Sequence, residues 1–275
     1  MSGTLILVGT PIGNLSDLSP RAREALENCD FIAAEDTRVT LNLLNHFGIK
    51  KPLVSYFEHN KKERGPQICR RILDGETAVL VTDAGMPAIS DPGEDLVALC
   101  QQQQIPITVC PGPTAVTTAL ALGGLPTRRF TFEGFLSTDK RERRAHLESL
   151  VREPRTMVFY EAPHKLKGTL SDLLGSLGDR ELALARELTK LHEEVVRTTL
   201  SAALAQCDEK PPRGEYVLVV AGATPEEAVA ATPQQAATLA RSYMQEGASP
   251  SEAAKRAAAE CHVKKGEVYR LLVTE

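Results

Sequence analysis

The chain has 275 residues, of which 42% are hydrophobic and 25% are charged, and its formal net charge is −4. It contains no apolar run near the roughly 20 residues of a membrane span, and its N-terminus lacks the basic start and long apolar run of a signal peptide. These properties predict a cytoplasmic protein with two domains, and they argue against a surface covered in positive charge.

The cysteines and histidines do not form a metal-binding pattern. The six cysteines lie far apart without a Cys-x-x-Cys pair, and the six histidines are scattered. Without an expected export signal, such cysteines are predicted to be reduced and mostly buried. We therefore expect no bound metal ion.

The first half of the chain alternates between short apolar runs and helical segments. The apolar runs predict strands at residues 4–8, 31–34, 53–57, 78–81 and 105–109. Helices are predicted at residues 20–28, 41–47, 66–75, from 93 onward, and at 114–122. This alternation is typical of a mostly parallel sheet with helices on both faces.

Five polar or Gly/Pro-rich loops follow these strands: GTPIGN, AEDTR, FEHN, TDAGMP and CPGP. If the strands are parallel, the five loops share one edge of the sheet, where a single site could use all of them. The first loop is neither a GxGxxG motif nor a P-loop, so it gives no reason to expect a dinucleotide or ATP.

The stretch at residues 79–93, VLVTDAGMPAISDPG, is the most distinctive in the chain. A buried strand passes into a loop whose Gly and Pro residues prevent regular structure and permit close backbone approach to a ligand. Such a loop, between a strand and a helix, is where open α/β sheets bind small molecules. A plain connection is the alternative, although this loop is long for one.

The second half predicts another α/β unit after a boundary near residue 125. Strands are predicted at residues 130–132, 155–160, 182–185, 195–199 and 214–220, with helices at 139–151 and ending near 174. We expect domains at residues 1–125 and 126–222, a linker at 223–233 and a helical tail at 234–275. The tail predicts helices at 234–246, 250–260 and 264–272, in a helix-turn-helix-like arrangement or as an appendage for packing or dimerisation.

Residues 126–167 contain ten Lys and Arg against six acids, a local charge of +4. A polyanionic partner and an ordinary solvated helix surface both agree with this charge.

Eight strings occur in order: GTPIGNL, AEDTR, DAGMPAISDPG, PGP before TA, EGFL, FYEAPHK, ARELTK and GEYVLVV. Together they resemble the tetrapyrrole-methylase superfamily of S-adenosylmethionine enzymes, over residues 4–221. Within it, they are most similar to the ribosomal RNA small subunit methyltransferase I family, whose C-terminal extension the tail also resembles.

The resemblance implies two α/β domains with a cofactor cleft between them, and a homodimer. It implies 2′-O-methylation of a cytidine in the decoding region of 16S rRNA, with S-adenosylmethionine as cofactor. By the same resemblance, the cofactor contacts the loop after the fourth strand, the helix start after PGP, and strand ends of both domains: Pro11, Asp83, Ala84, Gly85, Met86, Ile89, Thr114, Ala115, Glu161, Glu187, Gly214 and Glu215.

Methyl transfer to a ribose hydroxyl requires orientation and removal of a proton. The candidate catalytic residues are Glu35, Asp36, Arg38, Glu161 and Lys190, with His59 and Arg186 as further possibilities at strand ends. Residue types alone do not choose among them, since the Glu35–Arg38 turn is equally typical of a structural ion pair. The candidate RNA-binding residues are Arg128, Arg129, Lys140, Arg141, Arg143 and Arg144.

Two other functions remain open. One is a methyltransferase acting on a tetrapyrrole or corrin precursor, and the other is a non-catalytic RNA-binding factor with the same fold. The basic stretch and the family-specific strings favour RNA, while cofactor binding would separate an enzyme from a binding factor.

Overall fold

The computed structural model describes residues 3–224, 233–245, 247–261 and 263–273. Most of the linker predicted at 223–233 lies outside these residues. The chain divides into two compact units, one of Met1–Glu148 with Arg155–Ala221 and one of Ser149–Pro154 with Gly222–Glu275. The larger unit holds both predicted α/β regions. Within the described residues, no helix is long and apolar enough to cross a membrane.

The first sheet has the order β3-β2-β4-β1-β5, and all its strand pairs are parallel, as the alternation predicted. Its strands are β1 (Leu5–Val8), β2 (Phe31–Ala34), β3 (Leu53–Ser55), β4 (Ala78–Val81) and β5 (Ile107–Cys110). The carboxyl ends of these strands therefore lie at one edge, where the five predicted loops begin.

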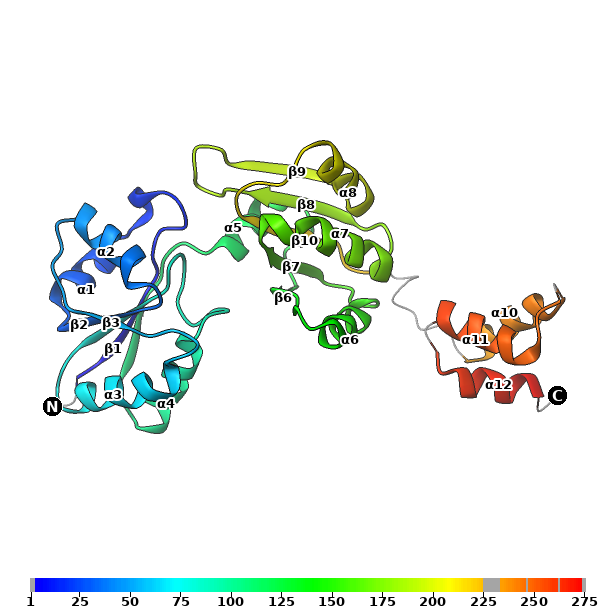
Figure 1. The fold of residues 1–275 in the computed structure, drawn as a ribbon, viewed down its shortest axis with the longest axis horizontal. Helices are drawn as coiled ribbons and strands as arrows, with labels where there is room; N and C mark the ends of the chain where they lie inside the picture. Colours follow the sequence, from blue (N-terminus) through cyan, green and yellow to red (C-terminus); the bar gives the residue numbers. More distant parts are fainter. Residues whose placement is uncertain (1–2, 225–232, 246, 262, 274–275) are drawn as a thin grey trace. The chain divides into compact units, whose positions relative to one another are not determined.

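Helices cover both faces of the first sheet. On one face lie α1 (Pro20–Asn28) and α2 (Thr37–His46), and on the other lie α3 (Lys61–Leu73) and α4 (Gly93–Gln102) (Figure 1). Because alternate strand residues point to opposite faces, β4 sends Leu80 into the α3/α4 core, and Val79 and Val81 into the α1/α2 core. Each fully buried side chain of this size contributes about 1.5–3 kcal/mol.

The start of α3 corrects a prediction. The sequence placed the helix start at Pro66, but α3 begins at Lys61 and contains Pro66 in its interior. The preceding residue is Gly65, which has no Cβ to clash with the proline ring and packs closely against Tyr56 and Leu99. A helical residue before proline is therefore tolerated here.

The second sheet has the order β6-β7-β10-β8-β9 and is mixed rather than parallel. Only the β6–β7 pair is parallel, because β10 runs antiparallel to both of its neighbours, and β8 and β9 form a hairpin. The strands are β6 (Phe130–Gly134), β7 (Thr156–Glu161), β8 (Glu181–Arg186), β9 (Glu194–Thr199) and β10 (Tyr216–Val220).

Helices also pack on the second sheet. One face is covered by α5 (Ala115–Gly123), which inserts Val116, Ala119 and Leu120 into the core of this sheet. The sheet also contacts α7 (Pro163–Leu177) and α8 (Leu200–Glu209), while α6 (Lys140–Leu150) joins β6 to β7. The α5 helix precedes the boundary expected near residue 125 yet belongs to the second core.

The smaller unit contains the predicted three-helix tail, formed by α10 (Pro233–Gln245), α11 (Pro250–Glu260) and α12 (Lys265–Val273). Its core consists largely of alanines, with Val268 buried among them. Ser249 caps α11 by accepting a hydrogen bond from the Glu252 N–H, and Pro250 occupies the first helical position.

Candidate active site

The loops after β1 and β4 are joined at the carboxyl edge of the first sheet. Thr10 and Gly85 exchange two backbone hydrogen bonds, with N···O distances of 2.9 and 3.1 Å. The buried Thr10 hydroxyl also donates to the carbonyl of Thr82, at 3.3 Å. The central loop is therefore held directly beside the GTPIGN loop.

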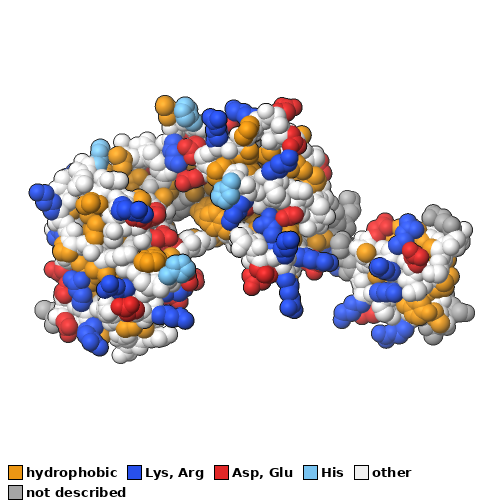
Figure 2. Space-filling view, viewed as in Figure 1, with side chains coloured by type: hydrophobic (Ala, Val, Ile, Leu, Met, Phe, Trp, Pro, Cys, Tyr) orange, Lys and Arg blue, Asp and Glu red, His pale blue; other side chains and the backbone are white. Residues whose placement is uncertain are grey.

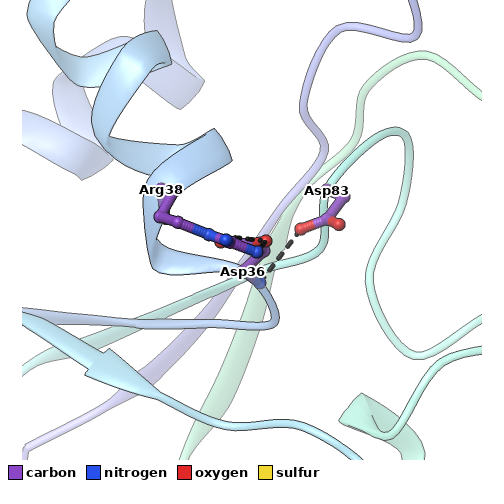
Figure 3. A network of polar contacts seen from close by, with 3 residues as sticks. All are labelled: Asp36, Arg38 and Asp83. Atoms are coloured by element: carbon purple, nitrogen blue, oxygen red, sulfur yellow. Dashed lines mark hydrogen bonds and ion pairs between the residues drawn. The ribbon is translucent and has the colours of Figure 1, made fainter.

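Three carboxylates gather at the same edge. Asp36 caps α2 and forms an ion pair with Arg38, while its backbone N–H donates to Asp83 Oδ1 at 3.0 Å (Figure 3). The Glu35 side chain accepts a hydrogen bond from the Thr82 hydroxyl at 2.7 Å. The loops after β2 and β4 are thus linked by both of these acidic residues.

The surroundings move the pKa values of two of these carboxyls in opposite directions. Hydrogen bonds from Arg38 lower the pKa of Asp36 to about 2. Partial burial raises the pKa of Asp83, and the nearby charges of Glu35 and Asp36 add to this effect against the hydrogen bond from the Asp36 N–H. Asp83 is therefore the more readily protonated of the two carboxyls.

The central loop turns through several left-handed residues. Gly85 has φ of +87°, and Ala88 and Ser90 have φ of +67° and +61° although they carry a Cβ. Asp91 holds this shape, because its carboxylate accepts hydrogen bonds from the N–H groups of Ala88, Ile89 and Gly93. The N–H groups of Ala88 and Ile89 are therefore used in hydrogen bonds within the loop itself.

The chain after β5 passes unusually close to β1. A Cβ on Gly112 would lie 2.8 Å from the Cα of Gly9, so only glycine fits without a backbone shift. The Gly112 N–H donates to the Met86 sulfur at 3.2 Å, which connects the central loop to the PGP segment. The adjacent Thr114 caps α5 and places Ala115 at the helix start.

In the second sheet, three predicted site residues form one network. Lys190 Nζ donates to Glu187 Oε1 at 3.0 Å and to Glu215 Oε2 at 2.9 Å. The hydrogen bond from Lys190 lowers the pKa of Glu187, and although burial opposes it, the two carboxylates raise the pKa of Lys190. The backbone of Gly214 packs against the Glu187 side chain.

The first loop contacts this network. A Cβ on Gly13 would lie 2.4 Å from Lys190 Cγ, and Ile12 joins the hydrophobic core of the second sheet. The GTPIGN loop is therefore anchored to both sheets, and it brings the Lys190 network to the loops of the first sheet.

Glu161 is buried at the end of β7. It is 4% exposed, and its two oxygens accept hydrogen bonds from the Ala162 N–H and the Thr169 hydroxyl. Across the described residues, no hydrogen bond or ion pair joins it to Glu35, Asp36 or Asp83. His59 is exposed and stacks edge-on against Phe57.

The predicted cofactor residues offer hydrogen-bond acceptors that suit S-adenosylmethionine. The carboxylates of Asp83, Glu187 and Glu215 match a ligand that carries an ammonium, a sulfonium and ribose hydroxyls, and the 52% exposed Ile89 adds an apolar contact. The buried Thr189 hydroxyl has no hydrogen-bond partner within the described part of the chain. A buried polar atom without a partner is consistent with a ligand at this position.

A small pocket of about 260 Å³ lies beside the acidic residues. It is lined by the first loop, one face of α2 and the end of β4: Thr10, Pro11, Gly13, Leu15, Val39, Thr40, Asn42, Leu43, Thr82 and Asp83. Sequence reasoning missed the α2 residues of this pocket. The available signal was the pair of apolar residues Val39 and Leu43, four positions apart on the helix that Asp36 caps.

The basic residues predicted to bind RNA differ in their surroundings. Lys and Arg side chains gather over α6 in Figure 2. Arg143 is engaged with Asp172 at 2.7 Å and with Thr169, and Arg144 pairs with Glu148. Among the described residues, no ion pair engages four other exposed side chains: Arg128, Arg129, Lys140 and Arg141.

Comparison with known proteins gives consistent results. The family model described as Tetrapyrrole (Corrin/Porphyrin) Methylases matches residues 4–204. The chain is 47% identical over 270 residues to the "Ribosomal RNA small subunit methyltransferase I" of Synechocystis, covering 98% of this chain and 97% of that relative. It is 48% identical to the protein of the same name from Thermotoga maritima, covering 80% and 99%.

Among solved structures, the fold is similar to that of a uroporphyrin-III C-methyl transferase from Thermus thermophilus, which was solved in complex with S-adenyl homocysteine. The TM-score is 0.55 at 20% identity, covering 79% of this chain and 97% of the other. At this identity, the likeness concerns the fold.

Proposed function

We propose that this chain, which belongs to the tetrapyrrole methylase family, transfers a methyl group from S-adenosylmethionine to ribosomal RNA of the small subunit. The relatives that match 98% and 80% of its length are both named ribosomal RNA small subunit methyltransferase I, which supports this proposal. The 47% identity over 98% of the chain is the observation that carries this proposal. The more specific reaction is methylation of the 2′-oxygen of a decoding-region cytidine in 16S rRNA.

The cofactor would be held by the central loop, the PGP segment and the Lys190 network. When bound, S-adenosylmethionine supplies an electrophilic methyl group on a sulfonium. Asp83 and Ile89 would contact it from the central loop. Thr114 would contact it from the start of α5, and Glu187 from the Lys190 network. Lys190 lowers the pKa of Glu187, and its hydrogen bonds orient the carboxylates of both Glu187 and Glu215.

Asp83 is the proposed acceptor of the ribose proton. It lines the pocket and is exposed, and its raised pKa brings it closer to the range of an effective base. Glu35 would act on Asp83 through its charge. Two other candidate carboxylates suit structural roles better, since Asp36 is held by Arg38, and Glu161 is buried with both oxygens engaged.

The exposed cations before β6 and at the start of α6 would hold the RNA by its phosphates. Arg128, Arg129, Lys140 and Arg141 are exposed and not engaged in ion pairs with described residues, so they can contact a polyanion without breaking internal contacts. Arg143 and Arg144 would add to this field while holding Asp172 and Glu148.

We further propose a cytoplasmic homodimer. The edge strand β5 supports the dimer, since its Val109 side chain is 43% exposed. Light scattering coupled to gel filtration would test it, with a mass near 60 kDa expected for two chains of 29.8 kDa and a mass of one chain contradicting it.

Transfer of labelled methyl groups tests the main proposal. Purified protein would be given labelled S-adenosylmethionine with small subunits lacking the modification, large subunits or a tetrapyrrole precursor. Label in small-subunit RNA alone is expected. Label in the tetrapyrrole alone would favour the other branch of the family, and cofactor binding without any transfer would favour a binding factor.

A further inference from the structure

The pocket beside the acidic residues has little in common with the predicted cofactor site. Of the described residues that line it, only Pro11 and Asp83 belong to both. The rest of the lining comes mainly from α2, which Asp36 caps, and from the first loop with Leu15 after it. Most residues of the pocket lining are therefore distinct from the predicted cofactor site, and Asp83 borders both sites.

The wall formed by α2 and Leu15 combines apolar surface with one amide. Leu15 and Val39 are 40% and 41% exposed, and Leu43 is partly buried beside them. Asn42 lines the same pocket, and within the described chain no hydrogen bond engages its side chain. Apolar side chains can cover the face of a nucleobase, while an amide can both donate to and accept from its edge.

The size of the pocket limits what it can hold. Its volume of about 260 Å³ is below the roughly 300–1,000 Å³ of pockets for drug-sized ligands. A molecule as large as S-adenosylmethionine would therefore extend beyond it, whereas a single pyrimidine base is a suitable occupant.

We propose that this pocket receives the base of the target nucleotide, turned out of the RNA, and that Asn42 reads the edge of that base. Leu15, Val39 and Leu43 would cover its faces. The ribose of the same nucleotide would then lie at Asp83, next to the cofactor. This inference rests on the proposed function and assigns Asn42 as a specificity-determining residue, since proteins that read RNA by sequence commonly splay a base out and hydrogen-bond its edge.

The first test replaces Asn42 with alanine and uses Asn45→Ala as a matched control. Asn45 is an exposed asparagine on the same helix, outside the pocket lining. On unmodified small subunits, Asn42→Ala should lower kcat/KM by about 5- to 150-fold, the range for loss of a good base contact. Asn45→Ala should leave it unchanged, and both variants should bind S-adenosylhomocysteine as the wild type does in calorimetry.

The second test fills the pocket without removing Asn42. Val39→Trp should block the base and lower methyl transfer, while Leu41→Trp, at a 48% exposed position of α2 outside the lining, should not. Thermal unfolding of both variants shows whether they fold.

Each outcome bears on a different statement. Equal activity of Asn42→Ala and Asn45→Ala would overturn the inference while leaving the proposed function intact. Weaker S-adenosylhomocysteine binding in Asn42→Ala would assign the pocket to the cofactor and also overturn it. A wild-type protein that methylates no RNA would contradict the proposed function itself, and this inference with it.

Discussion

The backbone N–H of Asp36 donates a hydrogen bond to the carboxylate of Asp83, with an N···O distance of 3.0 Å. This bond joins the start of α2 to the end of β4 (Figure 3). It places an exposed carboxylate with a raised pKa between the base pocket proposed here and the predicted cofactor site.

The pH dependence of methyl transfer tests Asp83. Because its pKa is raised by burial and by neighbouring charges, the single-turnover rate should rise with pH through a limb above the ordinary Asp value. Asp83→Asn should lose most of the rate and this limb. Glu35→Gln removes one of the charges that raises the pKa, so it should move the limb to lower pH. A limb unchanged in both variants would contradict the assignment.

The same profiles test the other carboxylates. Asp36→Asn and Glu161→Gln should retain the acid limb, because neither group takes the proton in this account. If Glu161→Gln removed the limb while the protein remained folded, the proton acceptor would lie on β7 instead.

The Asp36–Arg38 pair should contribute to stability in a defined pH range. The pKa of Asp36 is about 2 in the folded protein, below the ordinary 3.8. The stabilisation by the ion pair is therefore present above the ordinary value and is lost as pH falls towards 2. Asparagine also caps helices, and Asp36→Asn therefore isolates the ion pair. We expect the wild type to melt slightly higher than Asp36→Asn at neutral pH, with a difference that vanishes in acid. A difference independent of pH would point to the cap.

The close approach of Gly9 and Gly112 should not tolerate a methyl group. Gly112→Ala would place its Cβ 2.8 Å from the backbone of Gly9, and the overpacking should destabilise the protein by about 1–3 kcal/mol and weaken S-adenosylhomocysteine binding. The control is Gly168→Ala on α7, where nothing lies within 4 Å of the added Cβ. It should stabilise the helix by about 0.5–1 kcal/mol. Chemical denaturation and calorimetry measure both effects, and wild-type-like values for Gly112→Ala would refute the packing argument.

The exposed cations before β6 and at the start of α6, which form no ion pair with described residues, should determine the salt dependence of RNA binding. Replacing Arg128, Arg129 and Arg141 with glutamine should weaken binding and reduce the slope of log K against log salt by about 2–3, at roughly 0.7–0.9 per lost phosphate contact. The matched control replaces three exposed cations of α1 and α3 with glutamine: Arg23, Lys62 and Arg64. Equal slopes for both triple variants would assign Arg128, Arg129 and Arg141 to solubility.

Local signals predicted much of the fold. The apolar runs located all five strands of the first sheet, and the Ser19–Pro20 and Ser249–Pro250 pairs marked helix starts that the structure contains. The parallel first sheet followed from the alternation, because parallel strands need crossover connections.

Long-range packing explains the remaining differences. The sequence did not reveal that β10 runs antiparallel between β7 and β8, since strand order depends on tertiary contacts. It also missed α8, although Thr199 offered a cap before an alanine-rich run. The engagement of Arg143 by Asp172 and the α2 wall of the pocket require residues far apart in sequence. Exposure and pairing of a charged side chain are not visible in a string of letters.

Mapping the methylated atom tests the central proposal most directly. Small subunits labelled by the wild-type protein would be digested with alkali, which cannot cleave a phosphodiester beside a 2′-O-methyl group. We predict that the label is found in an alkali-stable dinucleotide that begins with 2′-O-methylcytidine. Label in alkali-released mononucleotides would show methylation of a base, and it would contradict a site built to take a proton from a ribose hydroxyl.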